Sequence, residues 1–332
     1  MYKLRKRKQE DSHENNALKV LMDTPSIGRL TEEQRIEMTT SCRDTDDIPK
    51  VKNAGSIERV KGVEVQVLHN GIVVEKDGYV GPWMTKIIHE LKGHHEPQEE
   101  VAFYEVLKRL HEGSTMIELG SYWAYYSLWF NKSIKDARNI CCEPDPKNRK
   151  LGERNAALNG VHGVEFISAA AGSRHGEKVK ISLDSDATQE VEVQVASIDG
   201  LVAEKKLKKI DILHLDVQGV ELDVLEGARE SIEDGRIRFI FVSTHHYIFS
   251  KSAKTHIDCL NFIKSLGGHI ISSHTVPESF SGDGLIVASF SDEDRNFVVT
   301  TSINHTDRSL FRPYEEDLQI LLDAYSSTKP QQ

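Results

Sequence analysis

Acidic side chains stand at the ends of several predicted strands in this 332-residue chain. Glu118, Glu143 and Asp216 each close an apolar run, and Asp199 follows a pair of alternating segments. Ligands bind an open parallel sheet at the carboxyl ends of its strands, so we expect these four carboxylates on one edge. A carboxylate there can accept hydrogen bonds from ligand hydroxyls or take a proton from one. The spacing therefore indicates a ligand site with acid–base chemistry.

The segment Met116–Ser127, MIELGSYWAYYS, predicts a strand, a glycine turn and the start of a helix. Gly120 lets the backbone approach a ligand, and the helix N-terminus offers free N–H groups. A dinucleotide site needs G-x-G-x-x-G, whereas this turn has one glycine, bulky aromatic residues and no positive charge. Glu118 would repel a phosphate and tolerate a cation. The turn therefore favours S-adenosylmethionine over NAD.

The residue at the end of the second predicted core strand, 138–143, could bind the ribose of such a cofactor. Glu143 lies 23 positions after Gly120 and can accept two hydrogen bonds from ribose hydroxyls.

These residues need a scaffold, and strand and helix patterns alternate from Ser114 onward. Helical segments between strands imply right-handed βαβ units, so we expect a Rossmann-like α/β fold. Its seven-stranded, mostly parallel sheet closes with two strands that have no helix between them, which makes the last strand antiparallel. An inserted β-hairpin is expected over the pocket rim. The predicted core strands are 114–119, 138–143, 164–170, 210–216, 237–243, 269–273 and 284–290, the hairpin strands are 177–183 and 190–197, and the helices are 125–134, 146–158, 221–232 and 254–266.

Composition restricts the class of protein. Net charge is −10, and no apolar run approaches the roughly 20 residues of a membrane span. The basic run Lys3–Lys8 precedes no apolar segment, so it predicts a solvated tail and neither a signal peptide nor a nucleic-acid contact. The four cysteines show no C-x-x-C spacing and are expected to be small core residues in a reducing compartment. We therefore expect a cytoplasmic protein without a membrane span or nucleic-acid partner.

Three further segments carry a family resemblance. They read CCEPDPKNRKLGERNAALNG, VASIDGL and IDILHLDVQGVELDVLEGA, and follow the first turn in that order. Together with MIELGSYWAYYS they resemble the FkbM family of S-adenosylmethionine-dependent methyltransferases over about residues 96–290. The first turn departs from the family's D-x-G-A-N-x-G pattern, because Ala124 replaces the second glycine and Tyr122 replaces a small amide.

The resemblance implies a class I methyltransferase that methylates a sugar hydroxyl of a glycan or glycosylated metabolite. It also implies which residues bind the cofactor. The methionine part would contact Glu118, Gly120, Ser121 and Tyr122, with a hydroxyl contact from Ser127; Glu143 would hold the ribose, and Asp145 and Ala169 would lie near the adenine.

The acceptor hydroxyl must be aligned and must lose its proton. Asp216 is the first candidate for this role because it ends the central strand, and His245 is the second because a reference pKa of about 6.5 suits a base. Glu221 is expected to be a helix N-terminal charge. A divalent metal held by Asp216, Asp199 and a third oxygen ligand is an open alternative that no spacing demands. His94, His95 and His175 are expected on the surface or in loops, and Trp123 could stack on a sugar.

The predicted domain organisation has four parts. Residues 1–60 are expected to form a flexible polar extension with a capped helix from Thr31, and 61–95 a small β-rich segment. The methyltransferase domain is expected over 96–295. Residues 296–332 form a tail with a helix near 315–325 that packs back on the domain.

Other readings of the sequence are a lipid or peptide acceptor, and a non-catalytic binding module on a methyltransferase fold. An NAD-dependent epimerase or dehydrogenase would need the missing glycine fingerprint. The sequence leaves the oligomeric state open and is compatible with a dimer.

Overall fold

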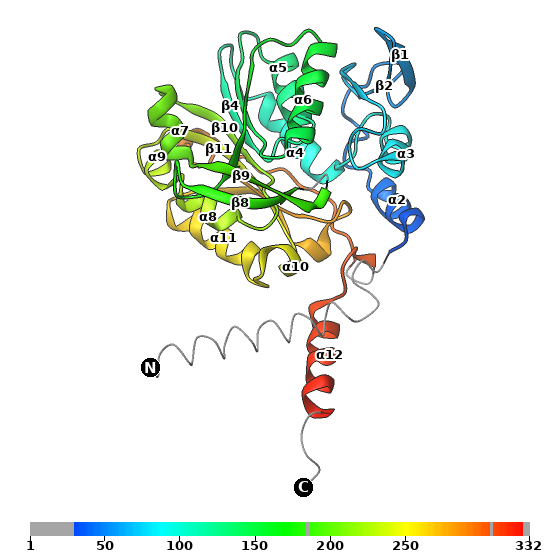
Figure 1. The fold of residues 1–332 in the computed structure, drawn as a ribbon, viewed down its shortest axis with the longest axis vertical. Coiled ribbons are helices and arrows are strands. Elements are labelled where there is room, and N and C mark those ends of the chain that lie inside the picture. Colours follow the sequence, from blue (N-terminus) through cyan, green and yellow to red (C-terminus); the bar gives the residue numbers. More distant parts are fainter. Residues whose placement is uncertain (1–29, 184–185, 306–307, 328–332) are drawn as a thin grey trace.

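A computed structural model describes residues 30–183, 186–305 and 308–327. The predicted basic run Lys3–Lys8 lies outside these residues. A seven-stranded sheet forms the centre, in the order β12-β13-β11-β10-β4-β5-β6 (Figure 1). Strand β13 is antiparallel to both neighbours, and the other pairs are parallel, which confirms the predicted fold class. The strands are β4 (Thr115–Leu119), β5 (Arg138–Cys142), β6 (Val164–Ile167), β10 (Ile210–Leu215), β11 (Ile237–Thr244), β12 (His269–His274) and β13 (Gly284–Ser289).

Helices cover both faces of this sheet, and each face has its own apolar core. Cys141 packs in one core and its neighbour Cys142 in the other, as the alternation of side chains along β5 requires. All four cysteines are buried and free, as predicted. The first face carries α4 (Pro97–Leu107), α5 (Tyr125–Ser133) and α6 (Pro146–Leu158); the second carries α7 (Ile198–Lys205), α8 (Glu221–Glu226), α9 (Arg229–Glu233) and α11 (Thr255–Ser265).

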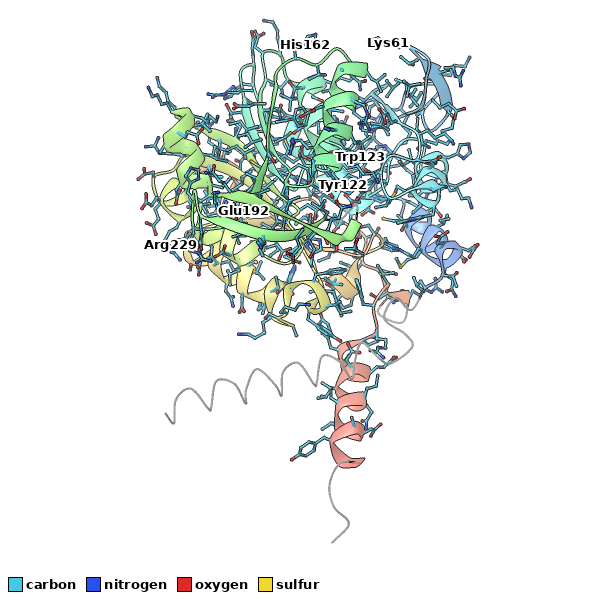
Figure 2. The ribbon with its side chains drawn as sticks, viewed as in Figure 1. Lys61, Tyr122, Trp123, His162, Glu192 and Arg229 are labelled. Atoms are coloured by element: carbon cyan, nitrogen blue, oxygen red, sulfur yellow. The ribbon has the colours of Figure 1, made fainter. Side chains whose placement is uncertain are left out.

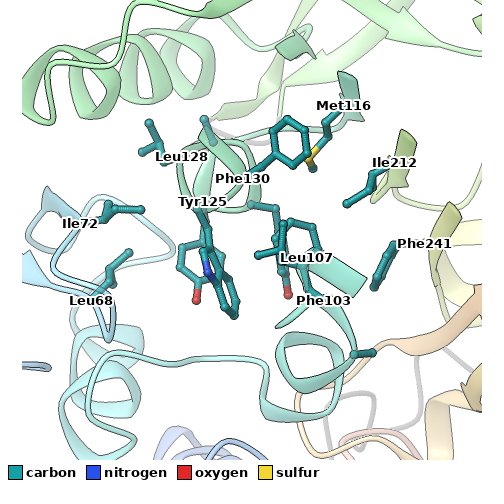
Figure 3. Packing of buried hydrophobic residues seen from close by; sticks show 14 of the residues in the cluster. Leu68, Ile72, Phe103, Leu107, Met116, Tyr125, Leu128, Phe130, Ile212 and Phe241 are labelled. Carbon is teal, nitrogen blue, oxygen red and sulfur yellow. The ribbon is translucent and has the colours of Figure 1, made fainter. Parts of the chain in front are cut away.

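Aromatic rings fill the first core (Figure 3). Phe103 of α4 packs edge-on against Phe241 of β11, with ring centroids 5.6 Å apart, and lies 5.2 Å from the ring of Trp129. These buried rings fix α4 and α5 against the sheet. The N-terminal ends of both helices are therefore held at the carboxyl edge of the strands.

The predicted third strand is divided between two sheets. Its first half is β6, whereas its second half, β7 (Ala169–Ala171), leaves the central sheet and pairs in parallel with β9. The sequence alone could not show this break because both halves are equally apolar. β9 (Asp186–Ala196) and β8 (Lys178–Leu183) form the predicted antiparallel hairpin, so the second sheet has the order β7-β9-β8.

An N-terminal unit lies beside the α5–α6 face (Figure 1). Its strands β1 (Ile57–Val60), β2 (Val63–Val67) and β3 (Val73–Glu75) form an antiparallel sheet, and α3 (Pro82–Glu90) follows. Asn155 of α6 and the C-cap residue Asn159 attach it, because their amide oxygens accept hydrogen bonds from the backbone of Glu75 and Val73, respectively, at 2.9 Å each.

The flexible extension expected over residues 1–60 is not what the structure shows for residues 30–60. Helix α2 (Glu32–Ser41) has the predicted capping box at Thr31 and Gln34. It is then fixed by distant contacts: Met38 packs in a cluster with Leu310, and the Thr39 hydroxyl donates to the Phe280 carbonyl at 2.7 Å. Contacts this distant in sequence leave no local pattern.

The C-terminal segment also differs from the prediction. Helix α12 (Tyr314–Ser327) forms, but it extends away from the main body (Figure 1). Its first turn is attached by Asp317, which accepts from the Tyr247 hydroxyl at 2.6 Å, while Leu318 is 57% exposed. The short elements α10 (Tyr247–Ser250), η1 (Val276–Glu278) and η2 (Asp292–Asp294) complete the described fold. Within the described residues, no helix has the length and apolar character needed to cross a bilayer.

Candidate functional site

A cavity of about 740 Å³ opens at the carboxyl ends of β4, β5 and β10, below the β8–β9 hairpin. Val179 and Ile181 of the hairpin form part of its wall, as expected for an insertion over the rim. Most of the predicted site residues line this cavity. They are Glu118, Gly120, Ser121, Tyr122, Glu143, Asp145, Ala169 and Asp216.

Asp199 does not share this edge, so that prediction is wrong. It lies on α7, and its carboxylate accepts from the backbone of Glu230 at 3.1 Å and Ser231 at 2.8 Å. These are N–H groups of the first turn of α9, which need an acceptor from outside the helix. Asp199 is therefore a helix-capping residue, and it cannot join Asp216 in a metal site.

Gly120 makes the turn after β4 possible. Its φ is +77°, and a Cβ placed there would lie 1.7 Å from the carbonyl oxygen of Asp216. No other residue fits, because the ends of β4 and β10 meet at this point. Ala124 and Tyr122 also have positive φ, at 63° and 39°, although neither is glycine. The departures from the family pattern thus stand at two positions whose backbone favours glycine.

Glu143 shapes the cofactor side of the cavity. Its Oε2 accepts from the backbone N–H of Tyr122 at 3.0 Å, and its Oε1 accepts from that of Asp145 at 2.8 Å. A carboxylate oxygen can accept more than one hydrogen bond, so these contacts orient the group for ligand hydroxyls. The Ser121 hydroxyl is buried in the same wall with no partner among the described residues. An acidic acceptor, an unsatisfied hydroxyl and the small residues of β7 fit a nucleoside with a charged amino-acid tail.

Glu118 lines the cavity, whereas Ser127 does not. Burial raises the pKa of the Glu118 carboxyl. The Ser127 backbone N–H donates to Glu118 at 3.2 Å, but the Ser127 side chain is fully buried, with its Oγ 3.0 Å from Cys141 Sγ. The structure therefore places Ser127 behind the cavity wall, where it supports Glu118.

Asp216 is held by a histidine and a second carboxylate. His245 Nε2 lies 3.2 Å from Asp216 Oδ1, and His245 Nδ1 contacts Glu221 Oε1 at 2.5 Å. Burial disfavours the imidazolium, but Asp283 together with Asp216 and Glu221 overcomes this and raises the pKa of His245 well above its usual value. Burial likewise opposes ionisation of Asp216, yet the contact with His245 lowers its pKa overall.

The charge state of His245 changes its expected role. A histidine that stays protonated at neutral pH cannot accept a proton there, and His245 does not line the cavity. Glu221, expected to be a helix N-terminal charge, is fully buried and orients His245 instead. The neighbouring His246 does not line the cavity and stacks on Phe311 with ring centroids 4.2 Å apart.

Three glutamates at the start of α4 were not identified from the sequence. Glu96 lines the cavity, and its Oε2 accepts from the Tyr126 hydroxyl at 3.1 Å. Glu99 Oε1 lies 2.6 Å from His214 Nε2, and its other oxygen accepts from the Ser243 hydroxyl at 3.0 Å. The signal in the sequence was a cluster of acidic residues in a first helical turn, which is common on exposed helices.

The third of these glutamates binds two histidines that were expected on the surface or in loops; both lie in the loop before α4, but not at the surface. His94 and His95 are buried. Glu100 provides a polar partner for both, because it accepts from the His95 backbone N–H at 2.8 Å and contacts His94 Nδ1. Among the described residues, His69, His94 and Glu100 are close enough to hold a metal. The rings of His69 and His94 stack at 4.1 Å and 14°, however, so their nitrogen lone pairs run parallel instead of converging. The group is best described as a hydrogen-bonded network.

Aromatic residues of the Gly120 turn and of the N-terminal unit form another part of the cavity wall. Tyr79, from the N-terminal unit, stacks on Trp123 with ring centroids 4.6 Å apart, and both line the cavity. Tyr122 meets Tyr79 edge-on at 5.1 Å. Tyr122 and Trp123 stand side by side at the centre of the molecule, near the end of the hairpin (Figure 2).

Solved structures with a similar fold are distant in sequence. A precorrin-6y C5,15-methyltransferase from Geobacter metallireducens is 14% identical, with 58% of this chain and 88% of that chain covered and a TM-score of 0.37. TrmK of M. capricolum, in complex with S-adenosylhomocysteine, is 13% identical, with 60% and 74% covered and a TM-score of 0.38. A S-adenosylmethionine-dependent methyltransferase from Aquifex aeolicus is 11% identical, with 57% and 89% covered and a TM-score of 0.36.

No curated protein sequence matches the chain. The model of the methyltransferase FkbM domain, in contrast, matches residues 111–270, which hold the Gly120 turn, Glu143, Asp216 and His245. This match agrees with the motifs in the sequence and with the strand order of the central sheet. Residues 111–270, just under half of the chain, thus match the methyltransferase FkbM domain, and the methyl donor of such methyltransferases is S-adenosylmethionine.

Proposed function

We propose that this methyltransferase transfers the methyl group to a hydroxyl of a sugar, in a glycan or a glycosylated metabolite. The observation that carries the proposal is the position of Asp216, an ionised carboxylate in the same cavity as the Gly120 turn. A sugar hydroxyl is weakly acidic, so its methylation needs a group that takes the proton.

The cofactor half of the cavity is formed by the ends of β4 and β5. Ser121 and Glu118 would bind the amino-acid tail, and Glu143 would accept from the ribose hydroxyls. Ala169 and its small neighbours in β7 leave a flat wall for the adenine, beside Asp145. When bound, S-adenosylmethionine supplies an electrophilic methyl group on a sulfonium.

The acceptor half is formed by Asp216, Glu96 and the aromatic wall. Asp216 would align the acceptor hydroxyl by accepting its hydrogen bond, then take its proton as the oxygen forms its new bond. The His245 imidazolium keeps Asp216 ionised and fixes its orientation, and Glu221 holds His245. The rings of Tyr79 and Trp123 would pack against the apolar face of a sugar.

The test is methyl transfer to a panel of acceptors. Full-length protein with S-adenosylmethionine is incubated with methyl glycosides, free oligosaccharides, a lipid mixture and peptides. We expect the mass of one methyl group, on oxygen, to be added to one or more of the sugars. Methylation confined to the lipid or peptide arm would reject the sugar proposal. Binding of the cofactor without transfer to any arm would favour a non-catalytic module.

The ribose assignment has its own test. Replacing Glu143 by alanine should weaken S-adenosylmethionine binding by about 10- to 100-fold, because one or two charge-assisted hydrogen bonds are lost. Calorimetric titration measures this change. Glu153→Ala on α6 is the control, since that side chain is 48% exposed and pairs with Arg149. Equal affinity of wild type and Glu143→Ala would remove Glu143 from the cofactor site.

A further inference from the structure

We propose that the cavity selects neutral or amine-bearing sugars as acceptors and rejects phosphorylated and nucleotide-linked ones. This inference rests on the proposed function and narrows its substrate class. It depends on the balance of charge around the cavity and on how each charged group is already paired.

Carboxylates dominate the charged groups of the cavity. Glu118, Glu143 and Asp145 are 3% exposed or less. Because water screens buried charges weakly, these carboxylates act strongly on a charged ligand in the cavity. Asp216 faces the acceptor half. The six lining carboxylates are Glu96, Glu118, Glu143, Asp145, Asp216 and Asp223.

Positive charge is scarce and already occupied. Arg174 is the one lysine or arginine among the lining residues that the structure describes. Its side chain is 74% exposed and its Nε lies 2.8 Å from Glu177. The lining histidines are also paired, His95 with Glu100 and His214 with Glu99. Phosphate recognition in proteins uses arginine forks or lysine, and no such group is available here.

Backbone N–H groups near helix starts can also bind an anion, but carboxylates of the chain already accept from three of those that precede α4 and α8. At the start of α4, Glu100 accepts from the backbone of His95 and Glu96 at 2.8 and 3.0 Å. At the start of α8, Glu221 accepts from the backbone of Gly219 at 2.8 Å. A phosphate brought beside Asp216 would therefore meet a like charge, and the described lining residues offer it no lysine and no unpaired arginine in compensation.

Glu96 makes the same half of the cavity suited to an amine. Glu96 lines the cavity, with its Oε2 3.4 Å from His95 Nε2 and 3.1 Å from the Tyr126 hydroxyl. Burial raises the pKa of this carboxyl to about 8; the neighbouring His95 opposes the shift, whereas Asp216 adds to it. An ammonium group between Glu96 and Asp216 would restore ionisation of Glu96 and be held by two carboxylates. A neutral hydroxyl can be accepted by either carboxyl group without a charge mismatch.

The experiment compares matched acceptors under identical conditions. Full-length protein and S-adenosylmethionine are supplied with methyl hexosides, hexosamines, hexose phosphates and nucleoside diphosphate hexoses. Release of S-adenosylhomocysteine gives kcat/KM for each. We expect the phosphorylated and nucleotide-linked arms to be at least about 10-fold poorer than the neutral sugar of the same configuration. Equal or better turnover of an anionic arm overturns the inference but leaves the proposed function standing. Cofactor binding with no turnover in any arm overturns both.

Two variants test the electrostatic cause. Glu96→Gln should lower kcat/KM for hexosamines about 3- to 10-fold relative to methyl hexosides, since one carboxylate is lost.

Val220→Arg places a cation on an exposed lining residue and should raise kcat/KM for hexose phosphates by about 3-fold or more. Glu112→Gln is the matched control, because Glu112 is exposed and precedes β4 at the opposite edge of the sheet. Unchanged selectivity in both variants would show that charge does not select the acceptor.

Discussion

Replacement of Asp216 by asparagine should lower kcat by about 10²- to 10⁴-fold, the usual contribution of a general base. Affinity for S-adenosylmethionine should stay within about twofold, because we propose that Asp216 contacts the acceptor and not the cofactor. Asparagine has nearly the same shape and can still align a hydroxyl, but its amide cannot take a proton. The loss should therefore appear in kcat much more than in the KM for the acceptor.

Single-turnover assays and calorimetric cofactor titration measure the two quantities on one preparation. Asp258→Asn on α11 serves as control, since that carboxylate pairs with Lys254 outside the cavity. Retention of more than about a tenth of wild-type kcat in Asp216→Asn would exclude Asp216 as the proton acceptor. Loss of cofactor binding would place it in the cofactor half instead.

Removal of the Glu100 carboxylate should be the most destabilising change of a single side chain considered for this protein. Glu100 is fully buried and accepts from two backbone N–H groups, and from the Tyr125 hydroxyl at 2.9 Å. It also contacts the rings of His94 and His95. Glu100→Ala leaves these buried donors unpaired, so we expect a loss of about 3 to 5 kcal/mol in the free energy of unfolding.

Urea unfolding monitored by circular dichroism measures this loss. Glu105→Ala lies on the same helix and removes a partly exposed pair with Lys108, so it should cost about 1 kcal/mol or less. Similar unfolding free energies for the two variants would contradict a structural role for the buried network. If Glu100→Ala does not accumulate as folded protein, Glu100→Gln keeps the volume and should show a smaller loss of the same sign.

The scaffold was predictable from local patterns in the sequence. The alternation of strand and helix from Ser114 onward predicts the central sheet, since periodicity depends only on neighbouring residues. The opposite faces of Cys141 and Cys142 and the capping box at Thr31 follow for the same reason. The common edge of Glu118, Glu143 and Asp216 was also predictable, because the carboxyl ends of parallel strands meet at one side of a sheet.

The contacts between polar residues, in contrast, could be found only from the fold. Asp199 caps a helix far from the cavity, although its position after a strand resembles that of Asp216. His245 is a supporting cation because Glu221 and Asp216 enclose it, which a reference pKa cannot reveal. Glu99 and His214 are 115 positions apart, yet their side chains meet at 2.6 Å.

This difference arises because some properties depend on residues close in sequence and others on residues that are distant in sequence. Local patterns record the period of an element and the chemistry of its ends, which involve residues only a few positions apart. The charge state and partner of a buried group depend on what packs against it from other elements, and burial makes those partners decisive. The first turn at Gly120 could thus be located from the sequence, whereas the proposed acceptor half, with residues from α4, the end of β10 and the N-terminal unit, required the fold.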